Sequence, residues 1–156
     1  MNTNVKQIIE ILKQRNLKIS ACESFTGGLF SSTFTDVAGA SKVFVGSFIC
    51  YSNEFKIKQI KIAKQVIKKY GVISQECAEA MAFKTNKKLK TNLCVSFTGN
   101  AGPSSFENQP VGLSYITIYY LGKQWTFKFF KPNLTRERYK QEAVAFVLTK
   151  IIEILQ

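Results

Sequence analysis

The chain has 156 residues, carries a formal net charge of +12, is 46% hydrophobic and contains no histidine. This length and composition fit one compact domain, residues 1–156, and exclude an intrinsically disordered chain. Because histidine is absent, Ser-His-Asp and Cys-His catalysis and every histidine-ligated metal site are excluded, so a general base must be Lys, Glu, Asp, Tyr or Cys.

Helical and extended segments alternate in the first half of the chain. Apolar residues recur at helical spacing at the N-terminus, and alternating or continuous apolar runs indicate strands further on. We expect the second of these strands to be buried on both faces, because its sequence "KVFVGSFICYS" is strongly apolar. The expected order is helix, strand, helix, strand and two short helices, over residues 3–15, 17–23, 27–37, 42–52, 53–61 and 63–71.

The second half of the chain predicts a long helix, a strand, a hairpin and a closing helix. Ser74 and Thr135 are the expected N-caps of the two helices. The segments are a helix over 74–90, a strand over 92–99, an irregular loop over 100–110, a hairpin over 111–132 that turns at 121–123, and a helix over 135–155. This pattern predicts a three-layer α/β sandwich with a mixed sheet and helices on both faces.

Lysine carries nearly all of the positive charge. Only three of the 22 basic residues are arginine, and the lysines alternate with Ile and Val as on the exposed sides of helices. A nucleic-acid-binding domain nevertheless stays an alternative, favoured by the charge and by 13% aromatic residues.

The four cysteines lack any C-x-x-C pair and are expected to be buried thiols. No apolar run reaches the ~20 residues of a membrane helix, and charges interrupt the N-terminal segment, which predicts a cytoplasmic protein without a membrane partner.

Three polar corners follow predicted strands, where ligands gather in α/β folds. The first is "ESFTGG", in which Ser24 precedes Thr26, Gly27 and Gly28. Its backbone amides could bind an oxyanion, with Ser24 as a nucleophile. Alternatively, Ser24 or Thr26 only caps the following helix.

The second corner is "YSNEFK", which contains Tyr51, Asn53 and Lys56. Lys56 lies in the first turn of a predicted helix, where the helix dipole and partial burial would lower its pKa. A lysine of lowered pKa can serve as a general base in a protein without histidine. The alternative is a surface lysine whose ammonium points to water.

The third corner is "TGNAGP", a turn of small residues after a buried strand. Its amides could form a nest for an anion, or it is a plain tight turn. It supplies five further candidate ligand-binding residues: Thr98, Gly99, Asn100, Ala101 and Gly102.

Six short motifs together resemble the CinA C-terminal domain family. These are "ESFTGG", "TDVAGASKVF", "YSNEFK", "YGVIS", "TGNAGP" and "QPVG", which occur in the family's order over nearly the whole chain. The resemblance implies an α/β sandwich that hydrolyses the carboxamide of nicotinamide mononucleotide without a metal or other cofactor. It implies Ser24 as the nucleophile, assistance by Tyr51 and Lys56, and a nucleotide site along residues 98–103. It also implies that Arg136 contacts the phosphate of a small anionic nucleotide substrate.

Several positions depart from the family pattern. The segment "SSFENQ", residues 104–109, lacks the usual glycines, and Lys140 replaces a second arginine. A catalytically impaired domain that binds a nucleotide or a partner is therefore a second alternative. The "TFKFF" and "YITIYY" segments could also pair between copies of the chain in a homo-oligomer.

Overall fold

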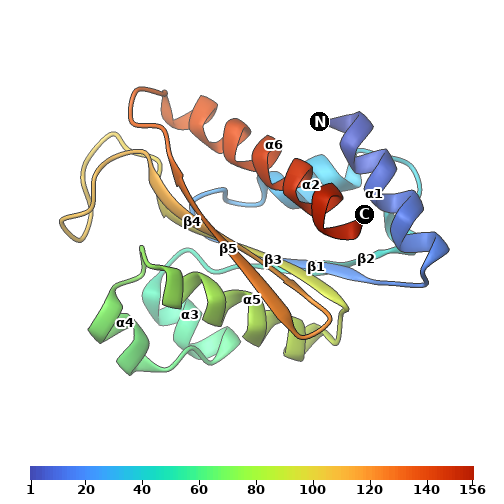
Figure 1. Cartoon of the computed structure of the whole chain (residues 1–156). Coiled ribbons are helices and arrows are strands. Elements are labelled where there is room, and N and C mark those ends of the chain that lie inside the picture. Colours follow the sequence, from blue (N-terminus) through green and yellow to red (C-terminus); the bar gives the residue numbers. More distant parts are fainter.

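The computed structural model describes all residues, 1–156, as a five-stranded sheet covered by helices on both faces (Figure 1). The strands are β1 (Ile19–Glu23), β2 (Phe44–Ile49), β3 (Leu93–Asn100), β4 (Leu113–Tyr120) and β5 (Lys123–Phe130), in the spatial order β2-β1-β3-β4-β5. β1 pairs in parallel with β2 and β3, whereas β4 and β5 run antiparallel to their neighbours. The predicted three-layer α/β sandwich with a mixed sheet is confirmed.

Two helical layers enclose the sheet. One layer holds α1 (Asn2–Gln14), α2 (Leu29–Thr35) and α6 (Arg136–Leu155), and the other holds α3 (Asn53–Ile60), α4 (Lys64–Tyr70) and α5 (Gln75–Leu89) (Figure 1). A 3-10 turn, η1 (Ala40–Lys42), connects α2 to β2. The first layer covers a cluster of 26 buried apolar residues and the second a cluster of nine. Apolar burial of this kind is the main favourable term in folding.

Side-chain caps fix where α5 and α6 begin. The Ser74 hydroxyl accepts from the Cys77 amide at 3.1 Å, and the Thr135 hydroxyl accepts from the Arg138 amide at 3.3 Å. Each cap satisfies one of the amides that a helix start leaves without an intrahelical partner. Both N-caps predicted from the sequence are therefore confirmed.

β2 is not buried on both faces as its sequence predicted. It is an edge strand that pairs only with β1, and Val45 and Ile49 are half-exposed on it. An apolar run predicts a strand but cannot show whether that strand lies at the centre or the edge of a sheet. β4, by contrast, lies between β3 and β5, so "YITIYY" has no free edge to pair with another copy.

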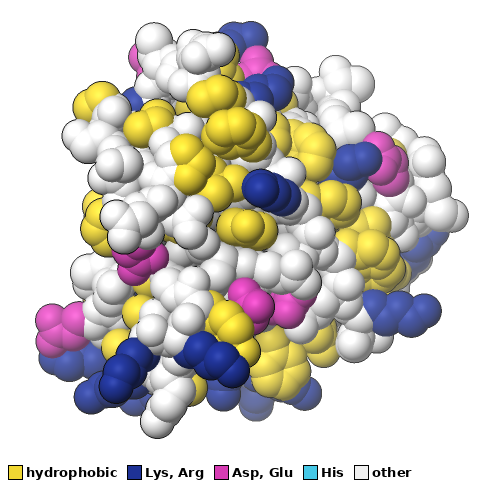
Figure 2. Space-filling model, turned by 60° about the vertical axis from the view of Figure 1, so that its left-hand side comes forward, with side chains coloured by type: hydrophobic (Ala, Val, Ile, Leu, Met, Phe, Trp, Pro, Cys, Tyr) yellow, Lys and Arg dark blue, Asp and Glu magenta, His cyan; other side chains and the backbone are white.

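Exposed lysines form the outer surface of the α3–α5 layer. Figure 2 shows Lys and Arg side chains gathered along the lower part of the molecule, where these helices lie. The exposed members are Lys58, Lys61, Lys64, Lys68, Lys69, Lys84, Lys87, Lys88 and Lys90. All four cysteines are buried and free. None of the helices has the length and apolar character needed to cross a bilayer.

Candidate active site

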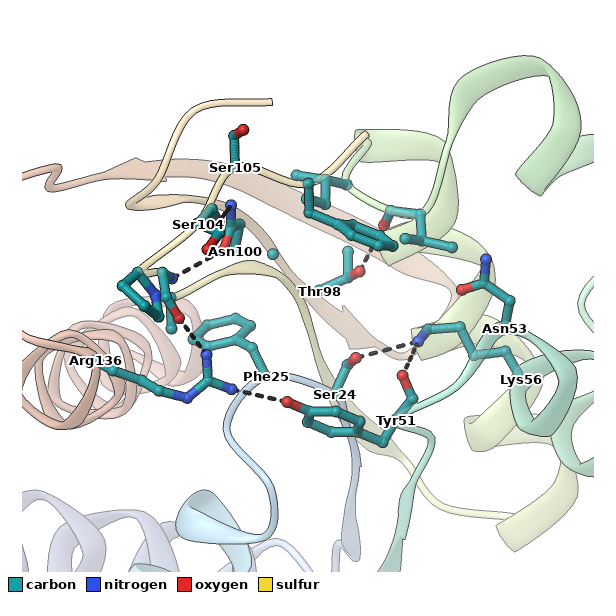
Figure 3. A pocket seen from close by; sticks show the side chains of 17 residues that line it. Ser24, Phe25, Tyr51, Asn53, Lys56, Thr98, Asn100, Ser104, Ser105 and Arg136 are labelled. Atoms are coloured by element: carbon teal, nitrogen blue, oxygen red, sulfur yellow. Dashed lines mark hydrogen bonds between the residues drawn. The ribbon is translucent and has the colours of Figure 1, made fainter. Parts of the chain in front are cut away.

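The three polar corners meet around one pocket at the carboxyl ends of β1, β2 and β3. The pocket has a volume of about 360 Å³ (Figure 3). It brings together ten of the residues singled out in the sequence: Ser24, Tyr51, Asn53, Lys56, Thr98, Gly99, Asn100, Ala101, Gly102 and Arg136. β1 is parallel to both of its neighbours, so these three strand ends share one edge of the sheet.

Glu23 builds the corner that presents Ser24. The Glu23 carboxylate is fully buried and accepts hydrogen bonds from the amides of Gly28, Phe30 and Ser31 at 2.9–3.1 Å. The Ser31 hydroxyl donates to it as well, at 2.6 Å. The carboxylate therefore satisfies the start of α2, and the capping role considered for Ser24 or Thr26 is wrong.

Lys56 is buried against Ser24. Its side chain is 1% exposed, and its Nζ lies 3.1 Å from Ser24 Oγ. Two carbonyl oxygens accept from the same Nζ, that of Cys50 at 2.7 Å and that of Tyr51 at 3.4 Å. A lysine ammonium that points to water is thereby excluded.

Burial is the main cause of the lowered pKa of Lys56. Desolvation lowers the pKa of Lys56 below its ordinary value of 10.5. None of the five ion pairs in the protein includes Lys56. The Glu107 carboxylate and three buried cysteines favour the charged form, but the effect of burial is larger, so the net change in the pKa is downward. In the neutral amine, the two carbonyls can accept both N–H bonds. The nitrogen lone pair is then left to accept the Ser24 proton.

The Tyr51 hydroxyl contacts Arg136 and not the Ser24–Lys56 pair. Arg136 Nη2 donates to Tyr51 Oη at 2.8 Å, and Nη1 donates to the Gly102 carbonyl at 2.5 Å. The Tyr51 side chain is 61% exposed. Figure 3 shows the tyrosine ring and the guanidinium side by side at the mouth of the pocket. The structure thus places the Tyr51 backbone, but not its hydroxyl, next to Lys56.

Hydrogen bonds within the loop and to the α4–α5 connection hold the third corner. The Thr98 hydroxyl donates to the Val72 carbonyl at 2.5 Å. Asn100 donates to the Ser104 carbonyl and accepts from the Gly102 amide, both at 2.8 Å. At Gly99 any Cβ would lie 2.2 Å from the Ser114 Cβ, so glycine is required for the approach of β3 to β4. These side chains shape the pocket wall.

Thr26, Gly27 and Gly28 do not line the pocket. The Gly28 amide donates to Glu23 and the Gly27 amide to the Ser24 carbonyl, so neither is free for an oxyanion. Thr26 is fully buried, and its hydroxyl has no hydrogen-bond partner. The amides of Phe25 and Thr26 have no acceptor in the protein. These two amides follow Ser24 directly.

Asn53 differs from the other polar wall residues. It lies at the start of α3 and lines the pocket close to Lys56 (Figure 3). Its side-chain amide makes no hydrogen bond within the protein. Asn53 can therefore offer both a donor and an acceptor to a ligand.

Sequence reasoning missed several residues that shape the site. It assigned no role to the Glu23 carboxylate, although an acid four residues before a glycine pair was visible. Val72 and Ile73 appeared only within the "YGVIS" motif and received no role, whereas in the structure they reach the pocket from the α4–α5 connection. No group of His, Cys, Asp or Glu side chains in the protein could hold a metal ion.

Comparison with known proteins assigns this architecture. The model of the CinA C-terminal domain matches residues 1–155. The chain belongs to the CinA C-terminal domain family. The Protein MG115 homolog of Mycoplasma pneumoniae is 35% identical over 148 residues, which are 95% of this chain and 94% of that protein. A CinA-like protein of Dictyoglomus turgidum is 43% identical over 132 residues, 84% of this chain but only 32% of its own length.

The solved structures agree with this family. The competence/damage inducible protein CihA of Agrobacterium tumefaciens superposes with a TM-score of 0.95 at 26% identity, covering 99% of this chain and 95% of that one. The chain spans between 27% and 34% of the length of five longer curated CinA relatives. The CinA-type domain is thus found both in proteins of this size and within longer ones.

Proposed function

We propose that this chain is a serine amidohydrolase that converts nicotinamide mononucleotide and water to nicotinate mononucleotide and ammonia. The observation that carries the proposal is the buried Lys56 amine 3.1 Å from the Ser24 hydroxyl. A serine needs a base to become a nucleophile, and a lysine of lowered pKa can be that base. The nicotinamide substrate comes from the resemblance to the CinA family.

Acylation begins when neutral Lys56 takes the Ser24 proton while Ser24 Oγ attacks the carboxamide carbon. The carbonyl oxygen becomes an oxyanion, which the free amide of Phe25, a residue that lines the pocket, can stabilise. The ammonium of Lys56 then gives its proton to the leaving nitrogen as the C–N bond breaks. Ammonia departs, and an ester joins Ser24 to the nicotinoyl group.

Deacylation repeats these steps with water. Lys56, again neutral, accepts a proton from the attacking water, and the tetrahedral intermediate collapses with cleavage of the ester bond. Lys56 returns that proton to Ser24 Oγ, so nicotinate mononucleotide leaves and the unmodified serine is regenerated. The same lysine acts as base and acid in both halves of the reaction.

The anionic end of the substrate fits the Arg136 side of the pocket. Arg136 is the first residue of α6, and its guanidinium is fixed by Tyr51 and Gly102. A fixed guanidinium is well suited to bind a phosphate. The net charge of +12 adds a long-range attraction for an anionic nucleotide.

The direct test is ammonia release from nicotinamide mononucleotide by the purified chain, compared with Ser24→Ala. We expect steady release by the unmodified chain and a loss of at least about 10³-fold in Ser24→Ala, since a nucleophile cannot be replaced. Trapping the nicotinoyl ester on Ser24 by mass spectrometry would establish the covalent step. Nucleotide binding without ammonia release would contradict the proposal and favour a binding domain.

A further inference from the structure

A two-residue hairpin stands over the pocket at residues 106–109. Glu107 and Asn108 have φ of +51° and +56°, and the Gln109 amide donates to the Phe106 carbonyl at 2.9 Å. Phe106 and Gln109 form an isolated antiparallel bridge. Two consecutive left-handed residues are typical of a tight turn of this type. The segment that departs from the family pattern is therefore an ordered hairpin.

Glu107 fixes the hairpin to the opposite wall of the pocket. Its carboxylate accepts from the Val72 amide at 2.8 Å, in the connection between α4 and α5. Gly71 permits this contact, because a Cβ there would lie 2.7 Å from Glu107 Oε2. Asn100 holds the other end of the loop through the Ser104 carbonyl. The hairpin is thus anchored on both sides of the Ser24 pocket.

Phe106 is the one aromatic side chain of this pocket that makes neither a ring pair nor a hydrogen bond. It lines the pocket and yet is 52% exposed. Phe25 packs against Phe97 and Tyr139, and the Tyr51 hydroxyl is bound by Arg136. Phe106 takes part in no ring pair and no cation–π contact in the protein. A flat ligand that covers such a ring at the mouth of a pocket buries its exposed apolar surface and can stack on it.

We propose that Phe106 determines specificity by stacking on the planar heteroaromatic ring that bears the scissile carboxamide. The proposal rests on the amidase function proposed above and deepens it. It implies that this pocket selects aromatic carboxamides over aliphatic amides that carry the same phosphate. Stacking is present before and during the reaction, so its loss should raise KM and leave kcat largely unchanged.

Binding to the Ser24→Ala chain separates recognition of the ring from turnover. The two probes are nicotinamide mononucleotide and ribose 5-phosphate, which has the sugar and phosphate but no ring. We expect Phe106→Ala to weaken binding of nicotinamide mononucleotide about tenfold and to leave ribose 5-phosphate within twofold. Phe106→Tyr should restore tight binding, whereas Phe106→Leu, which is apolar but not planar, should restore little of it.

Two further variants test the placement of the ring. Phe130→Ala is the matched control, because Phe130 is 51% exposed and does not line the pocket. It should leave both affinities unchanged. Glu107→Ala keeps the ring but removes its anchor. Like Phe106→Ala, it should weaken the binding of nicotinamide mononucleotide.

The possible failures of the two proposals are distinct. Equal affinities for nicotinamide mononucleotide in Phe106→Ala and the Ser24→Ala parent would overturn the stacking proposal, even if the active chain releases ammonia. A Phe106→Leu chain that binds as well as the parent would also overturn it, because apolar contact alone would then suffice. A ring-specific loss in Phe106→Ala, without ammonia release by the unmodified chain, would support stacking and contradict the amidase.

Discussion

The Nζ of Lys56 lies 3.1 Å from the Oγ of Ser24, although 32 residues separate them in the chain. β1 delivers Ser24 and the start of α3 delivers Lys56, and the parallel pairing of β1 with β2 brings the two corners together. The Cys50 and Tyr51 carbonyls orient the amine. A serine and a buried amine in this geometry can serve as a nucleophile and a base without any histidine.

Replacing the amine should stop catalysis without disrupting the fold. Lys56→Met keeps the apolar stem within its buried site but removes the proton acceptor. We expect ammonia release to fall by about 10²–10⁴-fold, the usual contribution of a general base. The comparison is with Lys58→Met, which changes an exposed lysine of the same helix. Turnover by Lys56→Met close to that of the parent would refute the role of the amine.

The pH dependence of the reaction should report the pKa of Lys56. Burial lowers this pKa below 10.5, and only the neutral amine can accept the Ser24 proton. We expect kcat/KM to rise with pH and to level off after a midpoint below 10.5. Initial rates of ammonia release between pH 5 and about 10 measure this midpoint. A profile that is flat throughout, or that still rises at the ordinary lysine pKa, would contradict the assignment.

The same burial should appear in folding stability. Between the lowered folded pKa of Lys56 and its ordinary value of 10.5, the unfolded chain binds more protons than the folded one. The contribution of Lys56 to the free energy of unfolding therefore rises with pH in this window, and the full cost of burying the charge is present below it. Lys56→Met removes that cost. Urea unfolding at several pH values should show a more stable variant at neutral pH and a flatter profile above it.

The Tyr51 hydroxyl should affect substrate binding more than chemistry. In the structure it accepts from Arg136 and makes no hydrogen bond to Ser24 or Lys56. Tyr51→Phe should therefore leave kcat within about threefold and raise KM several-fold, because Arg136 loses a partner that fixes it. Tyr70→Phe, on α4, serves as the control. A fall in kcat of about 10²-fold or more would instead place the hydroxyl in proton transfer.

Glu23 should be essential to the corner that presents Ser24. Its carboxylate accepts from three amides and one hydroxyl, and it is fully buried. In Glu23→Gln an NH₂ group would face these donors, so we expect a loss of about 3 kcal/mol in the free energy of unfolding. Urea denaturation measures this loss, with the exposed Glu10→Gln as the control. A loss below about 0.5 kcal/mol would mean that the corner does not depend on the carboxylate.

Much of the fold could be predicted because its signals are local. The apolar spacing of α1, the N-caps Ser74 and Thr135, and the apolar run of β3 lie within single segments of the chain. The three corners could likewise be predicted to meet, since the ends of adjacent parallel strands share one edge. The exposure of β2 could not be predicted, because the position of a strand in the sheet depends on pairing between distant segments.

The sequence by itself determined the kinds of residue at the site. Without histidine, a general base had to come from the remaining side chains, and the resemblance to the CinA family implied Ser24, Tyr51 and Lys56 as the catalytic residues. Only the tertiary structure decided how they are used. Burial at 1% exposure lowers the pKa of Lys56, and the Tyr51 hydroxyl accepts a hydrogen bond from Arg136. Glu107 binds the Val72 amide and so anchors the hairpin that carries Phe106. These effects depend on desolvation and hydrogen bonding between distant segments, which no local pattern contains.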